Sequence, residues 1–296
     1  MAQKLISFDL RADFGFFKKP DVNYGLVMGY NMLHRPALLG LLGAIAGLHG
    51  YERRGELPDY YEKLRLLRLS IAPLDGWHDK GNFLKTNLMY TNTVGYANAD
   101  GGTLIVHEQT LVAPAYRVYL LLDLDDATQA VLYRNILAGE AVYLPYFGKN
   151  EHTVWWDTEG ENGVREYEFS KFDATKENFS IASVFVRKGT LRGQEAEPEI
   201  FFSEDTLLLP DSFLYFERLP IGFEQFQQKP KSKRDLKAQQ TSLEFGEPET
   251  EPKGNWEFQY QLADFAYTNW LLKPESVLDH LFEIRQGGKT EVIQMF

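Results

Sequence analysis

Residues 5–12 alternate between apolar and polar side chains with a period of two. One side of this pattern carries Ile6, Phe8, Leu10 and Ala12. The other side carries Ser7, Asp9 and Arg11. A period of two is that of a β-strand with one buried face. The pattern therefore predicts a half-buried strand over residues 4–12.

The stretch from Leu33 to Tyr51 changes to the three- and four-residue spacing of a helix that lies on a core. Its apolar positions are Leu38, Leu41, Leu42, Ile45 and Leu48. Pro36 suits the first helical turn because its missing N–H costs nothing there, and Gly50 is the predicted end of the helix.

A second stripe on this helix consists of Gly40, Gly43 and Gly47. Each glycine inside a helix costs about 1 kcal/mol relative to alanine, so something is expected to approach this bare face closely. One interpretation is that the helix presses tightly on a sheet. The other places a phosphate backbone near the helix start, where N–H groups and the helix dipole favour anions. Lys18, Lys19 and Arg35 lie nearby and fit the second interpretation.

Further elements follow along the first half of the chain. Helices are predicted over residues 59–65 and from Asp125 or Asp126 to Leu137, with a stop at Gly139. Strands are predicted over residues 67–74 and 116–122. The long polar segment between these strands contains turn residues and predicts a projecting β-hairpin over about residues 86–112.

The order strand, helix, strand, hairpin, strand, helix, strand is that of a ferredoxin-like domain, as in RNA-recognition motifs. The predicted fold class is therefore α+β, with a ferredoxin-like (RRM-like) N-terminal domain over residues 1–152 that carries the hairpin. A smaller β-rich C-terminal region is expected over residues 153–296. Within it, residues 227–255 have the proline content, charge and polarity of a mobile insertion.

Charge is distributed unevenly along the chain. The formal net charge of −11 argues by itself against a nucleic-acid partner. However, residues 1–150 hold 15 Lys and Arg against 15 Asp and Glu, whereas residues 151–296 hold 16 against 27. The neutral first half can therefore carry a local basic groove, and the acidic second half can meet a basic partner protein.

Several classes of chemistry are excluded or disfavoured by composition. The absence of cysteine excludes disulfides, thiolate metal sites and cysteine nucleophiles. The six histidines show no metal-ligand spacing, and no phosphate-binding loop or nucleophile elbow is present. No metal and no cofactor is therefore predicted. The longest apolar stretch, residues 37–48, is too short to cross a bilayer, so a cytoplasmic protein without a membrane partner is expected.

The combination of four segments resembles the CRISPR-associated Cas-five family, a branch of the repeat-associated RNA-binding (RAMP) superfamily. The segments are the opening strand, the aromatic and basic loop over residues 13–30, the helix stretch HRPALLGLLGAIAGLHGY and the later YLPYFGKNEH. The family's proline followed by a Leu/Gly-rich helix falls on residues 36–47, and its Gly-(Lys/Arg)-x-Glu piece falls on residues 148–151. The resemblance covers roughly the first 160 residues, and the overall size is most like the type I-B version.

This resemblance implies a non-catalytic subunit of the Cascade surveillance complex, a ribonucleoprotein of RNA-guided antiviral defence. Such subunits bind the 5′ handle of the crRNA, cap the filament of Cascade backbone subunits and dock the large subunit, so that target DNA is met indirectly. The family's protruding hairpin, called the thumb, corresponds to the hairpin predicted here. In the family's complexes, the thumb folds over the RNA.

The candidate RNA-binding residues follow from the resemblance together with side chains that can bind phosphate or a base edge or stack on a base. They are Arg11, Lys18, Lys19, Arg35, Lys85, Asn87, Tyr90, Lys149 and Asn150. Gly40, Gly43 and Gly47 are the candidate close-approach positions on the helix.

Two alternatives remain from sequence alone. One branch of the family cleaves repeat RNA without a metal, and here His107, Lys85 and a tyrosine such as Tyr30 would take the catalytic roles. That branch has a lysine immediately before its histidine, whereas this chain has Val106. The second alternative is a scaffold subunit that contacts only proteins, which the acidic second half permits.

Overall fold

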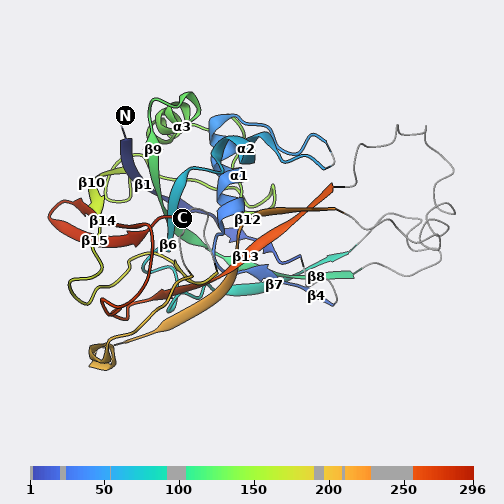
Figure 1. The fold of residues 1–296 in the computed structure, drawn as a ribbon. Helices are drawn as coiled ribbons and strands as arrows, with labels where there is room; N and C mark the ends of the chain where they lie inside the picture. Colours follow the sequence, from blue (N-terminus) through green and yellow to red (C-terminus); the bar gives the residue numbers. More distant parts are fainter. Residues whose placement is uncertain are drawn as a thin grey trace, which may run out of the picture.

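The computed structural model describes residues 3–20, 25–53, 55–91, 105–189, 197–208, 211–227 and 256–296. It is a mixed structure in which strands predominate over helices and form curled antiparallel sheets (Figure 1). No described helix is both long enough and apolar enough to span a membrane. The predicted insertion at 227–255 lies outside the described residues, apart from its first residue.

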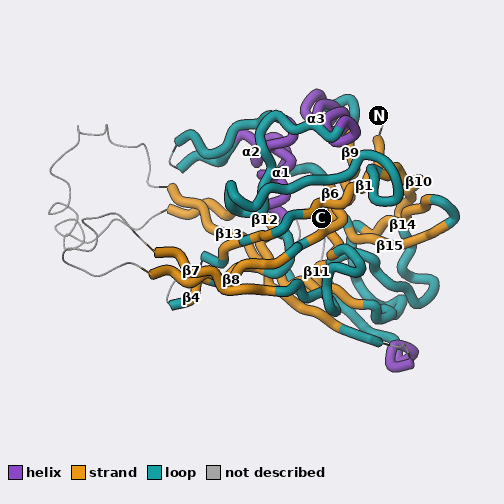
Figure 2. The backbone as a smooth tube through the Cα atoms, turned by 180° about the vertical axis from the view of Figure 1, so that it is seen from behind, coloured by secondary structure: helices purple, strands orange, loops and turns teal. Residues whose placement is uncertain are grey.

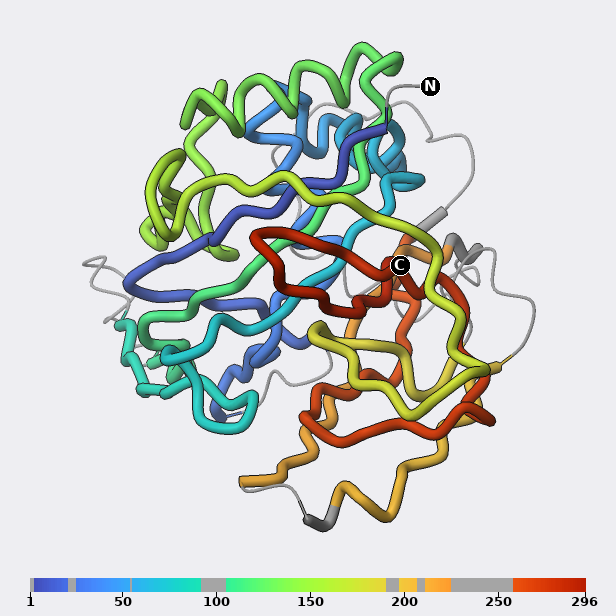
Figure 3. Tube along the Cα trace, turned by 90° about the vertical axis from the view of Figure 1, so that its left-hand side faces the viewer, coloured from blue at the N-terminus to red at the C-terminus, as the bar shows by residue number. Residues whose placement is uncertain are grey.

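A six-stranded antiparallel sheet forms the centre of the molecule, in the order β15-β14-β10-β1-β9-β6. Its strands are β1 (Gln3–Arg11), β6 (Arg68–Pro73), β9 (Ala115–Asp123), β10 (Arg165–Lys171), β14 (Leu281–Gln286) and β15 (Lys289–Gln294). Figure 3 shows the C-terminal hairpin β14–β15 beside β10, which in turn pairs with β1. The domain boundary predicted at residue 152 stays a prediction, and this sheet takes strands from both sides of it.

The opening strand is confirmed, but the prediction that only one of its faces is buried is wrong. Phe8 and Leu10 pack toward the helices, as the pattern indicates. Ser7 and Asp9 on the other face are also completely buried. Side chains of the neighbouring strands cover them, since Ser7 forms a hydrogen bond with Tyr167, and Arg117 and Arg165 pair with Asp9. No local pattern in β1 reveals these partners.

Three helices pack on the Phe8 face of the sheet: α1 (Arg35–Ala46), α2 (Asp59–Leu64) and α3 (Ala127–Ala138) (Figure 1). His34 caps α1 by accepting a hydrogen bond from the Ala37 N–H, and burial lowers the pKa of this histidine to about 3. The helix ends at Ala46 and not at the predicted Gly50, because Gly47 adopts φ 79° and turns the chain out of the helix.

The glycine stripe of α1 receives side chains of the protein itself. A Cβ at Gly43 would lie 2.4 Å from Cβ of Tyr60 on α2, and one at Gly47 would lie 3.0 Å from Val142. The groups that approach these glycines closely are thus side chains of this chain, Tyr60 and Val142, and not a phosphate backbone. They come from α2 and from the segment after α3, and not from the sheet, because α1 places the stripe on its outer side.

Gly43→Ala is expected to lower the free energy of unfolding by about 1–2 kcal/mol. The gain in helix propensity of about 1 kcal/mol is outweighed by the overlap with Tyr60. Gly40→Ala is the matched control, since its nearest neighbour would be 3.5 Å away, and it should be neutral or slightly stabilising. Urea unfolding of both variants measures the difference; equal values would contradict the packing described here.

The hairpin predicted over about residues 86–112 is present as two paired antiparallel strands. These are β7 (Lys85–Thr91) and β8 (Ile105–Val112); the turn between them lies outside the described residues. Four short strands support its base: β2 (Phe14–Gly15), β3 (Phe17–Lys18), β4 (Leu26–Val27) and β5 (Gly29–Tyr30). β2 and β4 pair with β8, while β3 pairs with β5.

A second long hairpin belongs to a three-stranded sheet in the order β11-β13-β12. Its strands are β11 (Phe185–Lys188), β12 (Leu214–Gln227) and β13 (Trp256–Thr268), and a short 3-10 turn covers Glu204–Leu208. Figures 1 and 2 show β12–β13 leaving the body on the same side as β7–β8. The two hairpins therefore form the two sides of one candidate binding surface.

Candidate nucleic-acid interface

Lys149 lies beside the β7–β8 hairpin between two aromatic rings. Its Nζ is 4.4 Å from the ring centre of Tyr90 and 5.2 Å from that of Phe16. The same Nζ forms an ion pair of 2.7 Å with Glu108 on β8. Burial by itself lowers the pKa of Lys149, but the hydrogen bond to Glu108 and its charge raise the pKa above the usual value. The ammonium group is thus charged and held in one place.

A second group of predicted residues meets around Glu217 of β12. The backbone N–H groups of Asn31 and Met32 each donate to this buried carboxylate at 2.9 Å. Lys19 Nζ lies 3.5 Å from it and 5.1 Å from the ring centre of Tyr30. Glu217 thereby connects the second hairpin to the loop that follows β1.

Lys85 joins this group through the side chain of Asn31, to which it donates a hydrogen bond of 2.9 Å. Burial lowers the pKa of Lys85. The negative charge of Glu217 partly opposes this lowering, whereas the positive charge of Lys19 lowers the pKa of Lys85 further. Lys85 and Lys19 are therefore brought together at the hairpin base, with Glu217 balancing part of their charge.

The pairing register decides which face of the hairpin each predicted residue occupies. Lys85 and Asn87 lie on one face, while Tyr90 lies on the other, because successive strand residues point to opposite sides. Asn87 is exposed, as are Lys18 on β3 and Asn150 beside Lys149. We call Phe16, Lys18, Tyr90, Lys149 and Asn150 the hairpin interface.

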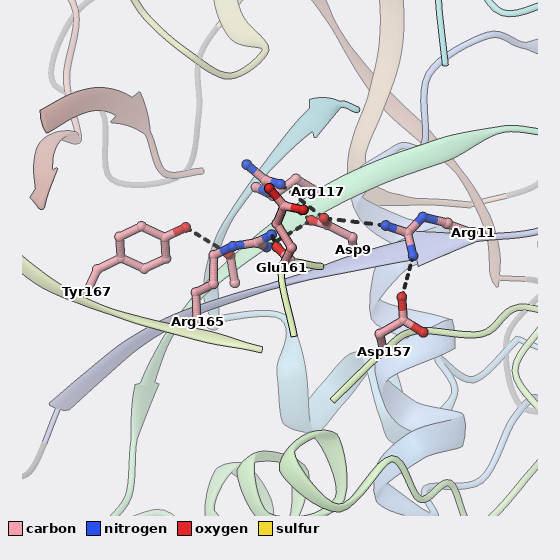
Figure 4. Close-up of polar contacts among 8 residues, drawn as sticks. Asp9, Arg11, Arg117, Asp157, Glu161, Arg165 and Tyr167 are labelled. Atoms are coloured by element: carbon pink, nitrogen blue, oxygen red, sulfur yellow. Dashed lines mark hydrogen bonds and ion pairs between the residues drawn. The ribbon is translucent and has the colours of Figure 1, made fainter. Parts of the chain in front are cut away.

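Two predicted arginines lie inside the protein. Arg11 is buried and pairs with Asp9 and Asp157 (Figure 4). Arg35 is also buried and donates to the backbone carbonyls of Arg65, Leu67 and Phe296. Arg35 could contact a phosphate only by breaking these hydrogen bonds. In this structure Arg35 instead links α1 to the chain after α2 and to the C-terminal residue.

The residues of the alternative cleavage site are separated. His107 pairs with Met89, and Lys85 pairs with Leu111, four positions further along β8. Four strand residues span about 13 Å. Tyr30 is buried beneath Lys19. Among the described residues, no group of three or more His, Asp or Glu side chains is arranged to hold a metal ion.

Three residues of the site were missed by sequence reasoning. Glu108, Asn31 and Glu217 hold Lys149, Lys85 and Lys19 in place. In the sequence, Glu108 and Glu217 look like any surface acidic residue, and only the burial of their side chains distinguishes them. For Glu108 a weak signal exists, since it occupies an inward position of an alternating strand.

No family model and no curated protein matches the sequence. Among solved structures, the chain aligns with one described as a CRISPR RNA-guided surveillance complex, with a TM-score of 0.34, 17% identity and coverage of 49% of this chain and 58% of that chain. A CRISPR protein from Archaeoglobus fulgidus aligns with a TM-score of 0.43 and 13% identity over 99% of both chains. A Cas protein aligns with a TM-score of 0.29 and 17% identity over 50% of this chain and 57% of that one.

These structural neighbours are CRISPR proteins. The chain spans less than two thirds of the length of the first and third of them. Because every TM-score is below 0.5, the function is inferred from the residues of this chain.

Proposed function

We propose that this chain is a non-catalytic, RNA-binding subunit of a CRISPR surveillance complex of the Cascade type, similar to the Cas-five family and its type I-B members. Its ligand is the 5′ handle of the crRNA, held at the hairpin interface. Its protein partners are the backbone subunit, whose filament it caps, and the large subunit. The chain then interacts with target DNA indirectly, through the assembled complex.

The arrangement of the central sheet supports a ferredoxin-like domain. The strands β10-β1-β9-β6 are neighbours in that order. Without the short helix α2 and the β7–β8 hairpin inserted between β6 and β9, the elements occur along the chain as strand, helix, strand, strand, helix, strand, with the helices on one face. This is the order of a ferredoxin-like fold, which many RNA-binding domains use but which does not by itself define a function.

The observation that carries the proposal is the hairpin interface. Lys149 is fixed between the rings of Tyr90 and Phe16, and Tyr90 remains 39% exposed. Exposed Lys18 lies two residues beyond Phe16, and exposed Asn150 follows Lys149. Glu108 offsets the charge of Lys149, so the attraction for phosphate comes from the exposed ammonium group of Lys18, while the exposed ring of Tyr90 is a surface on which an unpaired base stacks.

Lys18→Glu is expected to reduce RNA retention about three- to tenfold and to flatten its dependence on salt, because one phosphate contact becomes a repulsion. The tagged chain is co-expressed with its neighbouring genes and a repeat array, and the RNA that copurifies is quantified and its 5′ ends are sequenced. Lys188→Glu, an exposed lysine of β11, is the matched charge reversal and should retain RNA normally.

Uniform 5′ ends that begin in a repeat-derived handle would support the proposal. An intact protein assembly that carries no RNA would contradict it and favour the scaffold alternative. Equal loss in the two lysine variants would show that overall charge, and not the hairpin interface, holds the RNA.

A further inference from the structure

The face of the central sheet opposite α1 carries three arginines around a single aspartate (Figure 4). Arg117 makes two hydrogen bonds to the Asp9 carboxylate, at 2.7 and 3.0 Å. Arg165 Nη1 lies 3.4 Å from the same carboxylate, and Arg11 Nη2 lies 3.7 Å from it. Asp9 is completely buried.

This cluster contains more positive than negative charge. The second carboxylate within it is Asp157, which pairs with Arg11 at 2.8 Å and is half exposed. Arg165 otherwise donates to the backbone carbonyl of Glu161. Three guanidinium groups thus face two carboxylates, and the exposed fractions of the arginine side chains are only 9%, 25% and 16% for Arg11, Arg117 and Arg165. Excess charge in such a place is costly unless a counter-ion offsets it.

A polar cavity of about 470 Å³ opens beside the cluster, and Arg117 forms part of its wall. Lys289 and Glu291 of β15 also line it and pair with each other at 2.6 Å. Arg117 and Lys289 are near enough to repel each other. Asp75 also lines the cavity, and its negative charge contributes to raising the pKa of Lys289, although its side chain is almost fully exposed and water screens part of this charge.

The cavity also offers groups that suit a flat polar ring. Trp77 is 44% exposed at its wall, and Arg11 lies 5.9 Å from the ring centre of this tryptophan. Asn162 and Asn269 also line the cavity; the Asn269 side chain accepts a hydrogen bond from the Phe213 N–H and donates one to the Asp211 carbonyl. The size falls in the range of small-molecule sites.

We propose that this cavity binds a phosphate group carried by a nucleotide, with Arg117 and Lys289 facing the phosphate and Trp77 beside the base. Two N–H groups of Arg117 already donate to Asp9, so its remaining N–H groups and the ammonium group of Lys289 are the donors left for a phosphate. The phosphate comes either from a free mononucleotide or from the backbone of RNA. This site shares no residue with the hairpin interface, so a negative result at either site leaves the proposal for the other site unaffected.

The ion pair between Lys289 and Glu291 allows a test with two matched variants of the full-length protein. Isothermal titration calorimetry measures binding of adenosine 5′-monophosphate, with inorganic phosphate and adenosine as separate probes. Lys289→Gln should weaken binding of the monophosphate about fivefold, and Glu291→Gln should strengthen it by a similar factor, because one removes an attraction and the other a repulsion. Adenosine should bind much more weakly than its monophosphate.

The opposite signs separate the proposal from a structural effect, since both variants break the same ion pair and a structural effect would move them together. Changes of equal sign, unchanged affinity in both variants or no heat with either phosphate probe would overturn it. A ten-residue oligouridylate distinguishes the two sources of the phosphate. If it competes with inorganic phosphate, and Lys289→Gln weakens this competition, the site is assigned to RNA. Oligouridylate binding that this variant leaves unchanged assigns it to a free nucleotide.

Discussion

Replacing Asp9 by asparagine is expected to lower the free energy of unfolding by about 3–5 kcal/mol. The variant keeps the shape of the side chain but removes the carboxylate that Arg117, Arg11 and Arg165 share. Three guanidinium groups would then remain in a largely buried cluster with only the half-exposed Asp157 to balance them. Urea unfolding followed by tryptophan fluorescence measures the loss.

Asp157→Asn is the matched control for this prediction. It also removes one carboxylate from the cluster, but a half-exposed partner contributes only about 0–1 kcal/mol. If Asp9→Asn were no more destabilising than Asp157→Asn, the arginines would not depend on Asp9 for their burial, and the account of the cluster would be wrong.

Gly148→Ala is expected to cost about 3 kcal/mol and to reduce RNA retention at the hairpin interface. Gly148 has φ 80°, and a Cβ there would lie 1.9 Å from the backbone oxygen of Phe16. Left-handed strain contributes about 1–2 kcal/mol, and the overlap adds a further 1–3 kcal/mol because backbone must move. The movement would separate Phe16 from Lys149, whose contact with that ring defines the interface.

Gly160→Ala serves as the control because Gly160 has a similar φ of 79° with no neighbouring atom within 4 Å of the added Cβ. It carries the conformational strain without the overlap, so it should cost only about 1–2 kcal/mol and leave RNA retention unchanged. The two variants are compared by thermal unfolding and by the RNA that copurifies. Equal costs would show that the contact between Gly148 and Phe16 is not tight.

Local elements could be predicted where the signal is contained in neighbouring residues. The second long helix begins after Asp126, whose side chain accepts from the Gln129 N–H, and ends at Gly139 with φ 69°. Both features follow from cap chemistry that acts within four residues. The strand over Gln3–Arg11 and the hairpin β7–β8 were found in the same way, from periodicity and turn residues.

The candidate site could be predicted only as a list of residue types. Sequence reasoning named Lys149 and Tyr90, and the structure brings them within 4.4 Å. It also named Arg11 and Arg35, which lie inside the protein, because the segments that bury them are distant in the sequence. Arg35, for example, meets the carbonyl of Phe296. Burial of a charged side chain depends on such long-range partners, which periodicity does not report.

The central sheet has a consequence for how the chain folds during synthesis. β1 pairs with β10 about 160 positions later, and β10 then pairs with β14 of the C-terminal hairpin. A ribosome that has made β1, β9 and the helices has therefore built a sheet with an unpaired edge, which is a template for association with other chains. Contacts of such high sequence separation form late and slowly. The edge of β1 is closed by β10, and the edge of β10 then stays open until β14 is made at residues 281–286. Slow codons after residue 171 would therefore act on the solubility of the part of the chain already made.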